Sequence, residues 1–474
     1  MKQNIKKLSY FLLSTFVLLL FYLTYITFQQ GEELATHPQN RRMAAKEAAI
    51  IRGTIYDRQG VSLAETKWQG QAGQRVYQTV EHVFPSAHVV GYVSERYGSS
   101  GLEAAYSKEL LGLTEADAVE NLLDKILNRT PRGNDLILTL DASLQSRALA
   151  LLGNRRGAVV ALDPRTGAVL AMVSSPAFNS NTVKDPEIWE QLNKAEANAP
   201  LLNRATQGAY PPGSVIKLLT GAGILANHVD QPEKTIDCPG YVIIDGNKIT
   251  DNQVHHQVNF TKALALSCNT YFAQEGVKLG WHNLLDTFEK FGLNQNPDLE
   301  IPVRAGTFAV AERRNKSQLA ETSFGQGDTL LSPLHMALAC SAIANQGTIM
   351  KPYLVKEIRK PEGQVVRLTE SSPWLSATTP EIAGLITQGM VDAVDWGTGS
   401  GASLKGIKVA GKTGTAETKN TQDPTSAPHA WFVGFAPADN PQVVVAVIVE
   451  KGGSGSKVAA PIARDVMAAA LSGK

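Results

Sequence analysis

The sequence carries almost no net charge. Its 45 basic and 44 acidic residues leave a formal net charge of +1. No basic run stands out against this balance, so the charge pattern predicts no nucleic-acid partner. There is also no internal repeat and no long low-complexity tract. At 474 residues, with 43% hydrophobic and 19% charged residues, the chain has an ordinary globular composition and is long enough for two or more domains.

Cysteine is scarce. The three cysteines, Cys238, Cys268 and Cys340, are an odd number and far from a disulfide framework. We expect them to be small buried apolar side chains. A catalytic thiol at Cys268 is an alternative, but the sequence offers it no obvious histidine partner. The nine histidines are scattered, and the adjacent pair His255-His256 lacks helical spacing, so we predict neither a metal site nor a cofactor.

Only one hydrophobic run is long. Leu8 to Phe28 contains no charged residue and is long enough to cross a bilayer as a helix. Positive residues precede the run and negative ones follow it: Lys2, Lys6, Lys7, Glu32 and Glu33. This asymmetry predicts a cytoplasmic tail over residues 1–7, an anchor over 8–28 and an extracytoplasmic remainder. The alternative is a cleaved signal peptide, but the run is long for one and no Ala-x-Ala site closes it.

The rest of the chain divides near a turn cluster, Pro131-Arg132-Gly133-Asn134. Before it we expect a helical segment over 32–51, a strand, turn and strand over 52–64, and helices near 101–111 and 115–127. After it we expect a strand at 136–140, a helix at 142–152, a hairpin over 157–173, a mostly helical middle over 213–350, strands at 407–410, 430–435 and 443–450, and a final helix at 458–471. This order predicts an α+β fold, in which an antiparallel sheet flanked by helices stands beside an all-helical lobe. A groove between the two is the natural place for chemistry.

The most informative residue is Ser214, within Ser214-Val215-Ile216-Lys217. The loop Tyr210-Pro211-Pro212-Gly213 ends just before it, and an apolar run typical of a buried helix follows. Ser214 then lies in the first helical turn, with Lys217 on the same face. An adjacent amine can act as the base for a serine, and free backbone N–H groups can stabilise an oxyanion, so this arrangement predicts that Ser214 is a nucleophile. The simpler interpretation is an N-cap serine with a solvated lysine.

Two further motifs favour the nucleophile. Ser267-Cys268-Asn269 and Lys412-Thr413-Gly414-Thr415 follow in the chain order that marks penicillin-binding proteins and class A β-lactamases. A second Ser-x-x-Lys copy, Ser454-Gly455-Ser456-Lys457, lies in a Gly/Ser-rich stretch, and we interpret it as a loop.

With these motifs the chain resembles the class B penicillin-binding proteins, which are membrane-anchored peptidoglycan D,D-transpeptidases. The resemblance also rests on matches before and around the motifs: Arg52 to Ala64, His88, Gly91-Tyr92, Gly101-Leu102-Glu103, Gly208 to Ser214, Ala265 to Asn269, Gly325-Gln326-Gly327 and His429 to Phe435. It implies a small mixed pedestal domain over 29–134 and a transpeptidase domain over 135–474. The pedestal is short for the family, as in compact Gram-positive members.

The resemblance also implies roles for the motif residues. Ser214 would attack a D-Ala-D-Ala stem peptide to form an acyl-enzyme that β-lactams trap, with Lys217 as a neutral base. Ser267 would relay a proton to the leaving amine, and Asn269 would bind the substrate backbone and Lys217, although either could simply be the N-cap of the next helix. Lys412 would supply a nearby cation and attract the substrate carboxylate. Thr413 and Thr415 would bind that carboxylate, Gly414 would let the strand approach it, and the N–H groups of Ser214 and Thr415 would form the oxyanion hole. We expect Gly325-Gln326-Gly327 to be a structural turn near the groove.

Three other functions compete with this one. A class A β-lactamase needs a deacylating Glu-x-x-Leu-Asn element after the second motif, and none follows Asn269. A β-lactam sensor needs a cytoplasmic effector, for which residues 1–7 leave no room. A D,D-carboxypeptidase shares the same residues and differs only in the acceptor, so the pedestal alone favours a transpeptidase. The expected partners are peptidoglycan stem peptides, β-lactams, the cytoplasmic membrane and a SEDS-type glycan polymerase.

Overall fold

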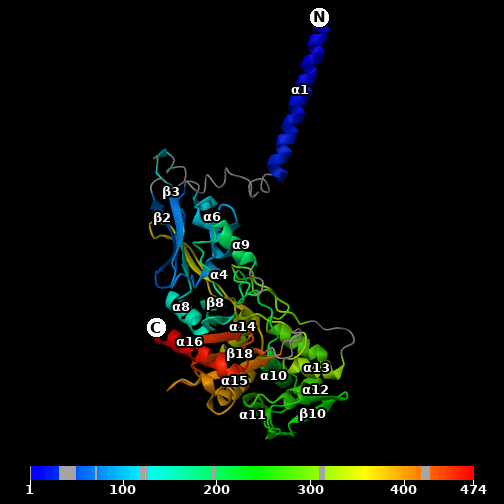
Figure 1. The fold of residues 1–474 in the computed structure, drawn as a ribbon. Coiled ribbons are helices and arrows are strands. Elements are labelled where there is room, and N and C mark those ends of the chain that lie inside the picture. The colour runs from blue at the N-terminus through cyan, green and yellow to red at the C-terminus, as the bar shows by residue number, and fades with distance from the viewer. Residues whose placement is uncertain are drawn as a thin grey trace.

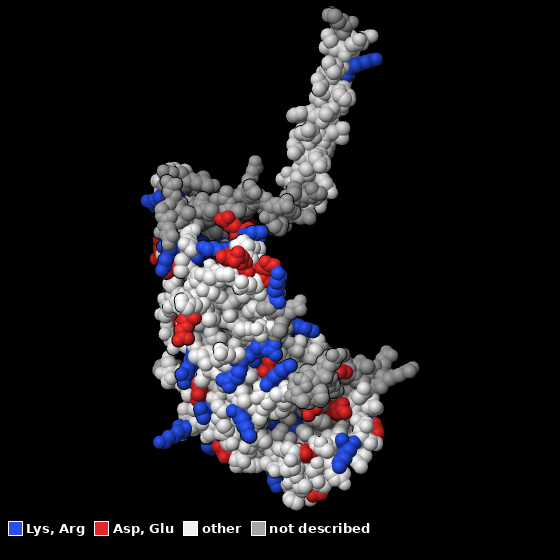
Figure 2. Space-filling model, in the orientation of Figure 1, with Lys and Arg blue, Asp and Glu red and all other residues white. Residues whose placement is uncertain are grey.

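The computed structural model describes residues 2–30, 50–69, 72–117, 123, 126–127, 129–194, 198–308, 315–417 and 427–473. Its first element is a long helix, α1 (Lys2–Tyr25), that ends in a short π-helical turn, η1 (Ile26–Gln30). Residues Gln3 to Tyr25 are long and apolar enough to cross a membrane. In Figure 2 this helix is uncharged along nearly its whole length, with basic side chains only near its free end. Nearly all of the expected helical segment 32–51 lies outside the described residues, as does most of the helix expected at 115–127.

A six-stranded sheet forms the part of the molecule that follows α1 in the chain, with the order β15-β14-β6-β1-β2-β3 (Figure 1). Its strands are β1 (Ile55–Tyr56), β2 (Ser62–Gln69), β3 (Ala72–Tyr77), β6 (Asp135–Leu138), β14 (Val355–Arg359) and β15 (Val365–Leu368). β1 pairs parallel with β6, and the other neighbours pair antiparallel. The strand, turn and strand predicted over 52–64 are confirmed as β1 and β2, whereas β14 and β15 join the same sheet from far downstream.

Short elements pack beside this sheet. They are α4 (Ala87–Val90), β4 (Val93–Ser94), β5 (Gly98–Ser99), α5 (Gly101–Ala105), α6 (Ser107–Leu110) and a 3-10 turn, η2 (Glu115–Asp117). A buried ion triad ties α5 to the sheet: Arg52 and Arg75 donate from Nε to the two carboxylate oxygens of Glu103, at 2.6 and 2.7 Å. Burial alone would raise the pKa of Glu103, but the two guanidinium groups outweigh it and lower that pKa. Glu103 therefore stays ionised as the charged centre of this unit.

The larger unit is built on a five-stranded antiparallel sheet with the order β17-β18-β19-β7-β8. The strands are β7 (Gly157–Leu162), β8 (Val169–Ser175), β17 (Ala410–Ala416), β18 (His429–Ala436) and β19 (Val443–Val449). The predicted hairpin, with its turn at Asp163 to Gly167, is confirmed as β7 and β8. The prediction of a strand at 407–410 is wrong in its position. Pairing with β18 starts at Ala410 and runs through Ala416, so the Lys-Thr-Gly motif lies inside β17.

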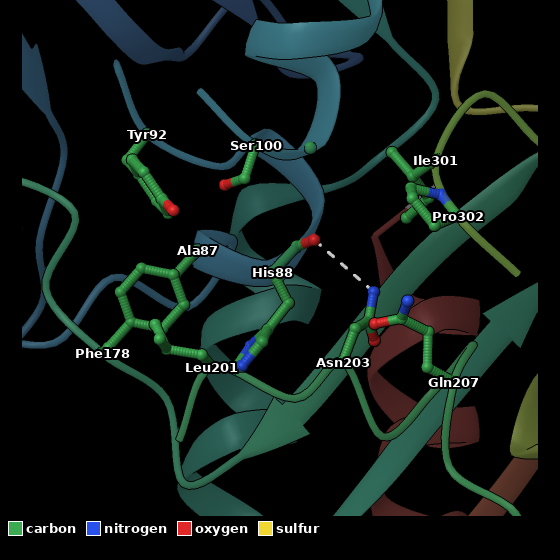
Figure 3. Close-up of a pocket in the computed structure, with 11 residues that line it drawn as sticks. Ala87, His88, Tyr92, Ser100, Phe178, Leu201, Asn203, Gln207, Ile301 and Pro302 are labelled. Carbon is green, nitrogen blue, oxygen red and sulfur yellow. Dashed lines mark hydrogen bonds between the residues drawn. The ribbon is translucent and has the colours of Figure 1, made fainter. Parts of the chain in front are cut away.

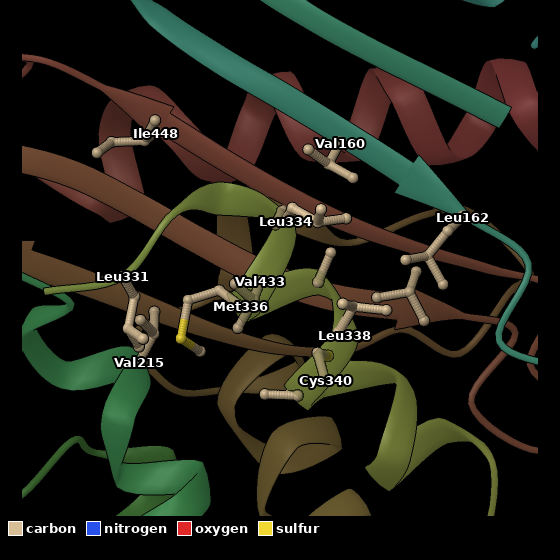
Figure 4. Close-up of a cluster of buried hydrophobic side chains, with 14 of the residues drawn as sticks. Val160, Leu162, Val215, Leu331, Leu334, Met336, Leu338, Cys340, Val433 and Ile448 are labelled. Carbon is tan, nitrogen blue, oxygen red and sulfur yellow. The ribbon is translucent and has the colours of Figure 1, made fainter. Parts of the chain in front are cut away.

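Helices cover both faces of this sheet, and this explains why its central strand is an unbroken run of apolar residues. Along β19, Val444, Ala446 and Ile448 belong to one buried cluster and the alternating valines to another. The first cluster includes α14 (Pro333–Ala344), as Figure 4 shows, and the second includes α8 (Ala142–Leu152) and α16 (Ala460–Ser472). The helix predicted at 142–152 and the final helix are therefore confirmed, and so is the α+β class.

The remaining lobe is mainly helical. It contains α10 (Lys217–Ala226), α11 (Phe260–Ala265), α12 (Asn269–Lys290) and α13 (Lys316–Ser323), while α15 (Pro380–Asp395) packs against α11 and β17. The lobe is not all-helical as predicted. Two small antiparallel ladders, β9 (Ile236–Cys238) with β12 (His256–Val258) and β10 (Tyr241–Ile244) with β11 (Asn247–Thr250), lie between α10 and α11. A further ladder joins β13 (Thr348–Met350) to β16 (Pro373–Ser376), and α9 (Pro186–Lys194) follows β8.

A pocket of about 150 Å³ lies where the two units meet (Figure 3). His88 and Tyr92 come from the first unit, and Phe178 and Asn203 come from the second. Asn203 Nδ2 donates to the His88 carbonyl at 3.4 Å, and His88 Nε2 lies 2.8 Å from the Pro200 carbonyl. Burial lowers the pKa of His88 to about 4. His88 is therefore neutral at neutral pH and joins the two units through hydrogen bonds.

Candidate active site

Ser214 lies where the loop from Tyr210 meets helix α10. A 3-10 turn, η3 (Gly213–Ile216), comes first, and the α-helix begins only at Lys217. The prediction that Ser214 lies in the first helical turn is thus confirmed, with a tighter turn than expected. Gly213 has a φ of 56°, and a Cβ there would lie 2.6 Å from the Thr415 carbonyl oxygen. Glycine is required at this position because β17 and η3 touch through their backbones.

The loop before Ser214 is held by side chains from β18 and from the end of β19. Trp431 Nε1 donates to the Pro211 carbonyl at 3.0 Å, and the Tyr210 hydroxyl donates to Glu450 Oε1 at 2.8 Å. Arg204 Nε donates to the same carboxylate oxygen at 2.7 Å. Burial opposes the ionisation of Glu450, but the Arg204 guanidinium and the hydrogen bonds outweigh it and lower the pKa. A charged anchor directly after β19 therefore fixes the entry to the serine turn.

Lys217 is fully buried and begins α10, directly after the turn that holds Ser214. Its Nζ donates to Asn269 Oδ1 at 2.7 Å, to the Ser267 carbonyl at 2.6 Å and to Ser267 Oγ at 3.2 Å. Within the described part of the chain its hydrogen bonds go to these two residues and none goes to Ser214. Burial lowers the pKa of Lys217 to about 8, although nearby Asp251 and Cys268 oppose the shift. An amine with this pKa has a usable neutral fraction at neutral pH and can act as a base.

Lys412 is also fully buried and approaches Ser267 from β17. Its Nζ donates to Ser267 Oγ at 2.8 Å and to the Thr413 carbonyl at 3.0 Å. Burial and the neighbouring Lys217 hold the pKa of Lys412 well below its usual range. Ser267 Oγ thus bridges two amines whose mutual repulsion disfavours a doubly charged state. The structure brings together the serine of the second motif and the lysines of the first and third.

Ser267 has a strained backbone. Its φ of 59° is in the left-handed region that non-glycine residues rarely adopt, and it turns the Ser267 carbonyl toward Lys217. The alternative interpretation, in which Ser267 or Asn269 is the N-cap of the next helix, is wrong. Cys268 is the N-cap of α12, and its sulfur accepts from the Tyr271 N–H at 3.4 Å. Because the thiol takes the capping position, the side chains on either side are free to face the lysines.

A groove of about 440 Å³ opens above these groups. It is lined by Ser214, Ser267, Asn269, Thr413, Gly414 and Thr415, all of which the sequence singled out. Any side chain at Gly414 would press on Val215, Pro212 and Trp431, so the glycine keeps this strand edge close to the serine turn. The two lysines lie beneath the floor and the hydroxyl groups form its surface.

Other lining residues were not predicted from the sequence to reach the groove: Asp251, Thr398, Glu417, Ser454 and Ser456. Thr413 Oγ1 donates to Thr398 Oγ1 at 2.9 Å, and the helix α15 that precedes Thr398 gave no signal of this contact. Gly325-Gln326-Gly327 is confirmed as a turn beside the groove, with φ values of 94° and 112° at its glycines. The loop interpretation of Ser454 to Lys457 is wrong, because a helical turn, η5 (Gly455–Ala459), runs directly into α16. Lys457 is nevertheless exposed, unlike Lys217.

Comparison with known proteins finds similarity along nearly the whole chain. Residues 157–468 match the family model of the penicillin binding protein transpeptidase domain, and residues 52–136 match that of the penicillin binding protein A dimerisation domain. Peptidoglycan D,D-transpeptidase PbpA of Mycolicibacterium smegmatis is 32% identical, over 99% of both chains. Peptidoglycan D,D-transpeptidase MrdA of Acinetobacter baumannii is 33% identical, over 82% of this chain and 66% of that protein.

Solved structures agree with this placement. Penicillin-binding protein A from M. tuberculosis, in its ceftriaxone acyl-enzyme complex, aligns with a TM-score of 0.83 at 33% identity, covering 90% of this chain and 99% of that one. The D,D-transpeptidase domain from Eggerthella lenta aligns with a TM-score of 0.80 at 32% identity, covering 90% of this chain and 99% of that one. The resemblance found in the sequence is therefore confirmed, and the chain belongs to the class B penicillin-binding proteins.

Proposed function

We propose that this protein is a serine-type peptidoglycan D,D-transpeptidase that cross-links stem peptides and is acylated by β-lactams. The observation that carries the proposal is the buried lysine pair bridged by Ser267 Oγ, in the groove that Ser214 also lines. Named D,D-transpeptidases among its relatives, and solved acyl-enzyme complexes of one of them with ceftriaxone and penicillin G, support it.

In the first half-reaction Ser214 Oγ attacks the carbonyl between two terminal D-alanines. Neutral Lys217 takes the hydroxyl proton, which the low pKa of its buried amine allows. The peptide C–N bond breaks, and the leaving D-alanine receives a proton through Ser267 Oγ, which contacts both lysines. The product is an ester between Ser214 and the shortened stem peptide.

In the second half-reaction an amine from a neighbouring stem attacks this ester. A new amide forms, Ser214 is released, and the acceptor proton returns through the same amine network. The backbone N–H groups of Ser214 and Thr415 act as the oxyanion hole, each such donor contributing on the order of 3 kcal/mol. Thr413 and Thr415 bind the substrate carboxylate, Lys412 attracts it when charged, and Asn269 orients the substrate backbone. The chemistry uses protein groups alone, without a cofactor.

The placement in the cell is part of the same proposal. Residues 1–7 lie in the cytoplasm, 8–28 form a single-pass anchor, 29–134 form the pedestal and 135–474 form the extracytoplasmic transpeptidase domain. The candidate span at Gln3 to Tyr25 and the basic residues at its start support this topology. A SEDS-type glycan polymerase is the expected membrane partner. Deletion of the pedestal would abolish their co-purification, and unchanged co-purification would reject this role.

The test is covalent labelling of the full chain in detergent with a fluorescent penicillin, followed by a chase over hours. We expect a persistent label on the wild type and none on Ser214→Ala. The matched control is Ser454→Ala, in the second Ser-x-x-Lys copy, where the lysine is exposed. This variant should still become covalently labelled, whatever its rate.

Each outcome assigns a function. A label that is lost within seconds indicates a β-lactamase. A label that persists, together with D-alanine release but no cross-linked dimer when an acceptor stem is supplied, indicates a D,D-carboxypeptidase. Labelling of Ser214→Ala equal to that of the wild type would reject Ser214 as the nucleophile.

A further inference from the structure

Two acidic side chains line the active-site groove, and they differ in exposure. The Asp251 side chain is only 1% exposed and accepts from the Thr270 N–H at 3.1 Å. Glu417 is exposed, and no hydrogen bond or ion pair joins its carboxylate to another described residue. The reaction steps proposed above use neither side chain. Among the described lining residues, Glu417 is thus an exposed charge that has no role in the chemistry.

Glu417 continues a row of groove-facing residues along β17. Side chains alternate along a strand, so Thr413, Thr415 and Glu417, at every second position, share one face. All three line the groove. β17 ends at Ala416 and is the edge strand of its sheet, so a peptide can lie along its outer edge. With a rise of about 3.3 Å per residue, Glu417 lies roughly 7 Å beyond Thr415 along that edge.

The proposed function fixes the direction of a stem peptide along this edge. Its terminal carboxylate lies at Lys412 and Thr413, and the carbonyl that Ser214 attacks lies at the Thr415 N–H. An extended peptide on a strand edge advances by about one strand residue for each residue of its own. The stem therefore continues from Thr415 toward Glu417, and the residue directly before the two D-alanines comes beside this carboxylate.

Hydroxyl groups lie near the same part of the groove. The Gly453 N–H donates to the Pro428 carbonyl at 2.9 Å, next to the strand end where β17 pairs with the start of β18. This contact holds Ser454 and Ser456 beside β17, where they line the groove with their hydroxyl oxygens 2.7 Å apart. An ammonium group carries three donors and no acceptor. The Glu417 carboxylate and these hydroxyls supply acceptors for it.

Cross-linking itself requires such a cation on the stem. The second half-reaction uses a side-chain amine of the acceptor, and donor and acceptor are copies of one precursor. A donor that has not yet served as an acceptor therefore carries a free ammonium of its own. We propose that Glu417 binds this ammonium and selects donor stems whose residue before D-Ala-D-Ala carries a cation and no free carboxylate. This specificity-determining role rests on the proposed function.

The first measurement is the affinity of dye-labelled pentapeptides for the full chain in detergent, followed by fluorescence anisotropy. Every protein in it carries Ser214→Ala, so that no peptide is consumed. The peptides end in D-Ala-D-Ala and differ only in the preceding residue, which is L-lysine, Nε-acetyl-L-lysine or Nε-succinyl-L-lysine. We expect the lysine peptide to bind about fivefold more tightly than the acetylated one, the upper range for an exposed ion pair, and the succinylated peptide to bind most weakly.

Added substitutions assign the preference to one carboxylate. Glu417→Gln should lose the preference for lysine over acetyl-lysine, and Glu417→Lys should favour the succinylated peptide. The matched control is Glu370→Gln, which removes the same charge from an exposed glutamate outside the groove lining and should keep the preference. Because salt screens exposed charges, the preference of the Ser214→Ala parent should also shrink as the ionic strength rises.

The second measurement is the rate of D-alanine release from the same peptides by the chain with Ser214 restored. At low peptide concentration the rates should follow the order of the affinities. This part depends on the proposed function, whereas binding to Ser214→Ala does not. If no D-alanine is released, the proposed function fails and the binding result stands.

Either of two binding results would overturn the role of Glu417. The Ser214→Ala parent could bind the lysine and acetyl-lysine peptides equally, or bind none of the three. Alternatively, the preference for lysine could survive unchanged in Glu417→Gln.

Discussion

Substitution of Gly325 by alanine tests how closely the serine turn depends on its neighbours. Gly325 has a φ of 94°, and a Cβ there would lie 1.8 Å from the carbonyl oxygen of Gly213, the residue before Ser214. Contacts of this kind below 3.0 Å are essentially never seen, so one backbone must move by more than 1 Å. The Gly213 N–H also donates to the Gly325 carbonyl at 3.1 Å, so the displacement passes directly to the nucleophile.

The expected effect has two parts that a control can separate. The positive φ costs about 1–3 kcal/mol of stability for any other residue. A misplacement of about 1 Å at a catalytic group costs on the order of 10²-fold in rate. Gly363, in the turn between β14 and β15, has the same φ of 94°, and a Cβ added there would meet nothing within 4 Å. Gly363→Ala therefore carries the backbone strain without the clash.

The assay is the second-order rate of acylation by fluorescent penicillin, with the free energy of unfolding measured on the same samples. We expect Gly325→Ala to lose more stability than Gly363→Ala, because the clash adds to the backbone strain, and only Gly325→Ala to lose about a hundredfold in acylation. Equal acylation rates in the two variants would refute the inference that the Gly325 contact positions Ser214.

Two further predictions concern buried charge. Glu103→Gln leaves two buried guanidinium groups uncompensated and should destabilise the first unit by about 3–5 kcal/mol in chemical unfolding, whereas Glu190→Gln, in an exposed pair with Lys194, should stay within about 0.5 kcal/mol. The folded pKa of Glu103 is depressed, so the stabilisation by its carboxylate is complete above the unfolded pKa of about 4.3 and is lost as the pH falls through the folded pKa. Equal losses of stability in Glu103→Gln and Glu190→Gln at pH 7 would contradict this prediction. The acylation rate should rise with pH, since with a pKa of about 8 only about a tenth of Lys217 is neutral at pH 7. A rate that is flat or falls between pH 7 and 9 would exclude Lys217 as the base.

Local sequence patterns predicted the elements whose residues repeat with a clear period. The helix at 142–152 and the hairpin of β7 and β8 were found at nearly their observed bounds, because turn residues and apolar runs mark both. The start of β17 was missed because alanine, glycine and lysine have weak strand preferences, and pairing with β18 decides the conformation instead. Likewise β14 pairs with β6 across more than 200 residues of chain, a contact that no local pattern specifies.

The site shows the same division. Motif order indicated Ser214, Lys217, Ser267 and Lys412. The fold brings both lysines to the Ser267 hydroxyl and places Ser214 and Ser267 along one groove. The order of the motifs could not predict that the two lysines are buried. Both lysines are fully enclosed, and enclosure is what lowers the pKa of each and makes an ordinary cation available as a base.

Cys268 makes the point most sharply. In the sequence it is the unspecified middle residue of the Ser-x-Asn motif, and we predicted no more for it than a small buried apolar side chain. In the fold it caps α12, touches the Thr270 hydroxyl and faces Cys238, Asp251 and His255. This cap fixes the turn in which both neighbours of the cysteine contact Lys217. The middle residue of the motif is thus as constrained as the two that flank it, and for a different physical reason.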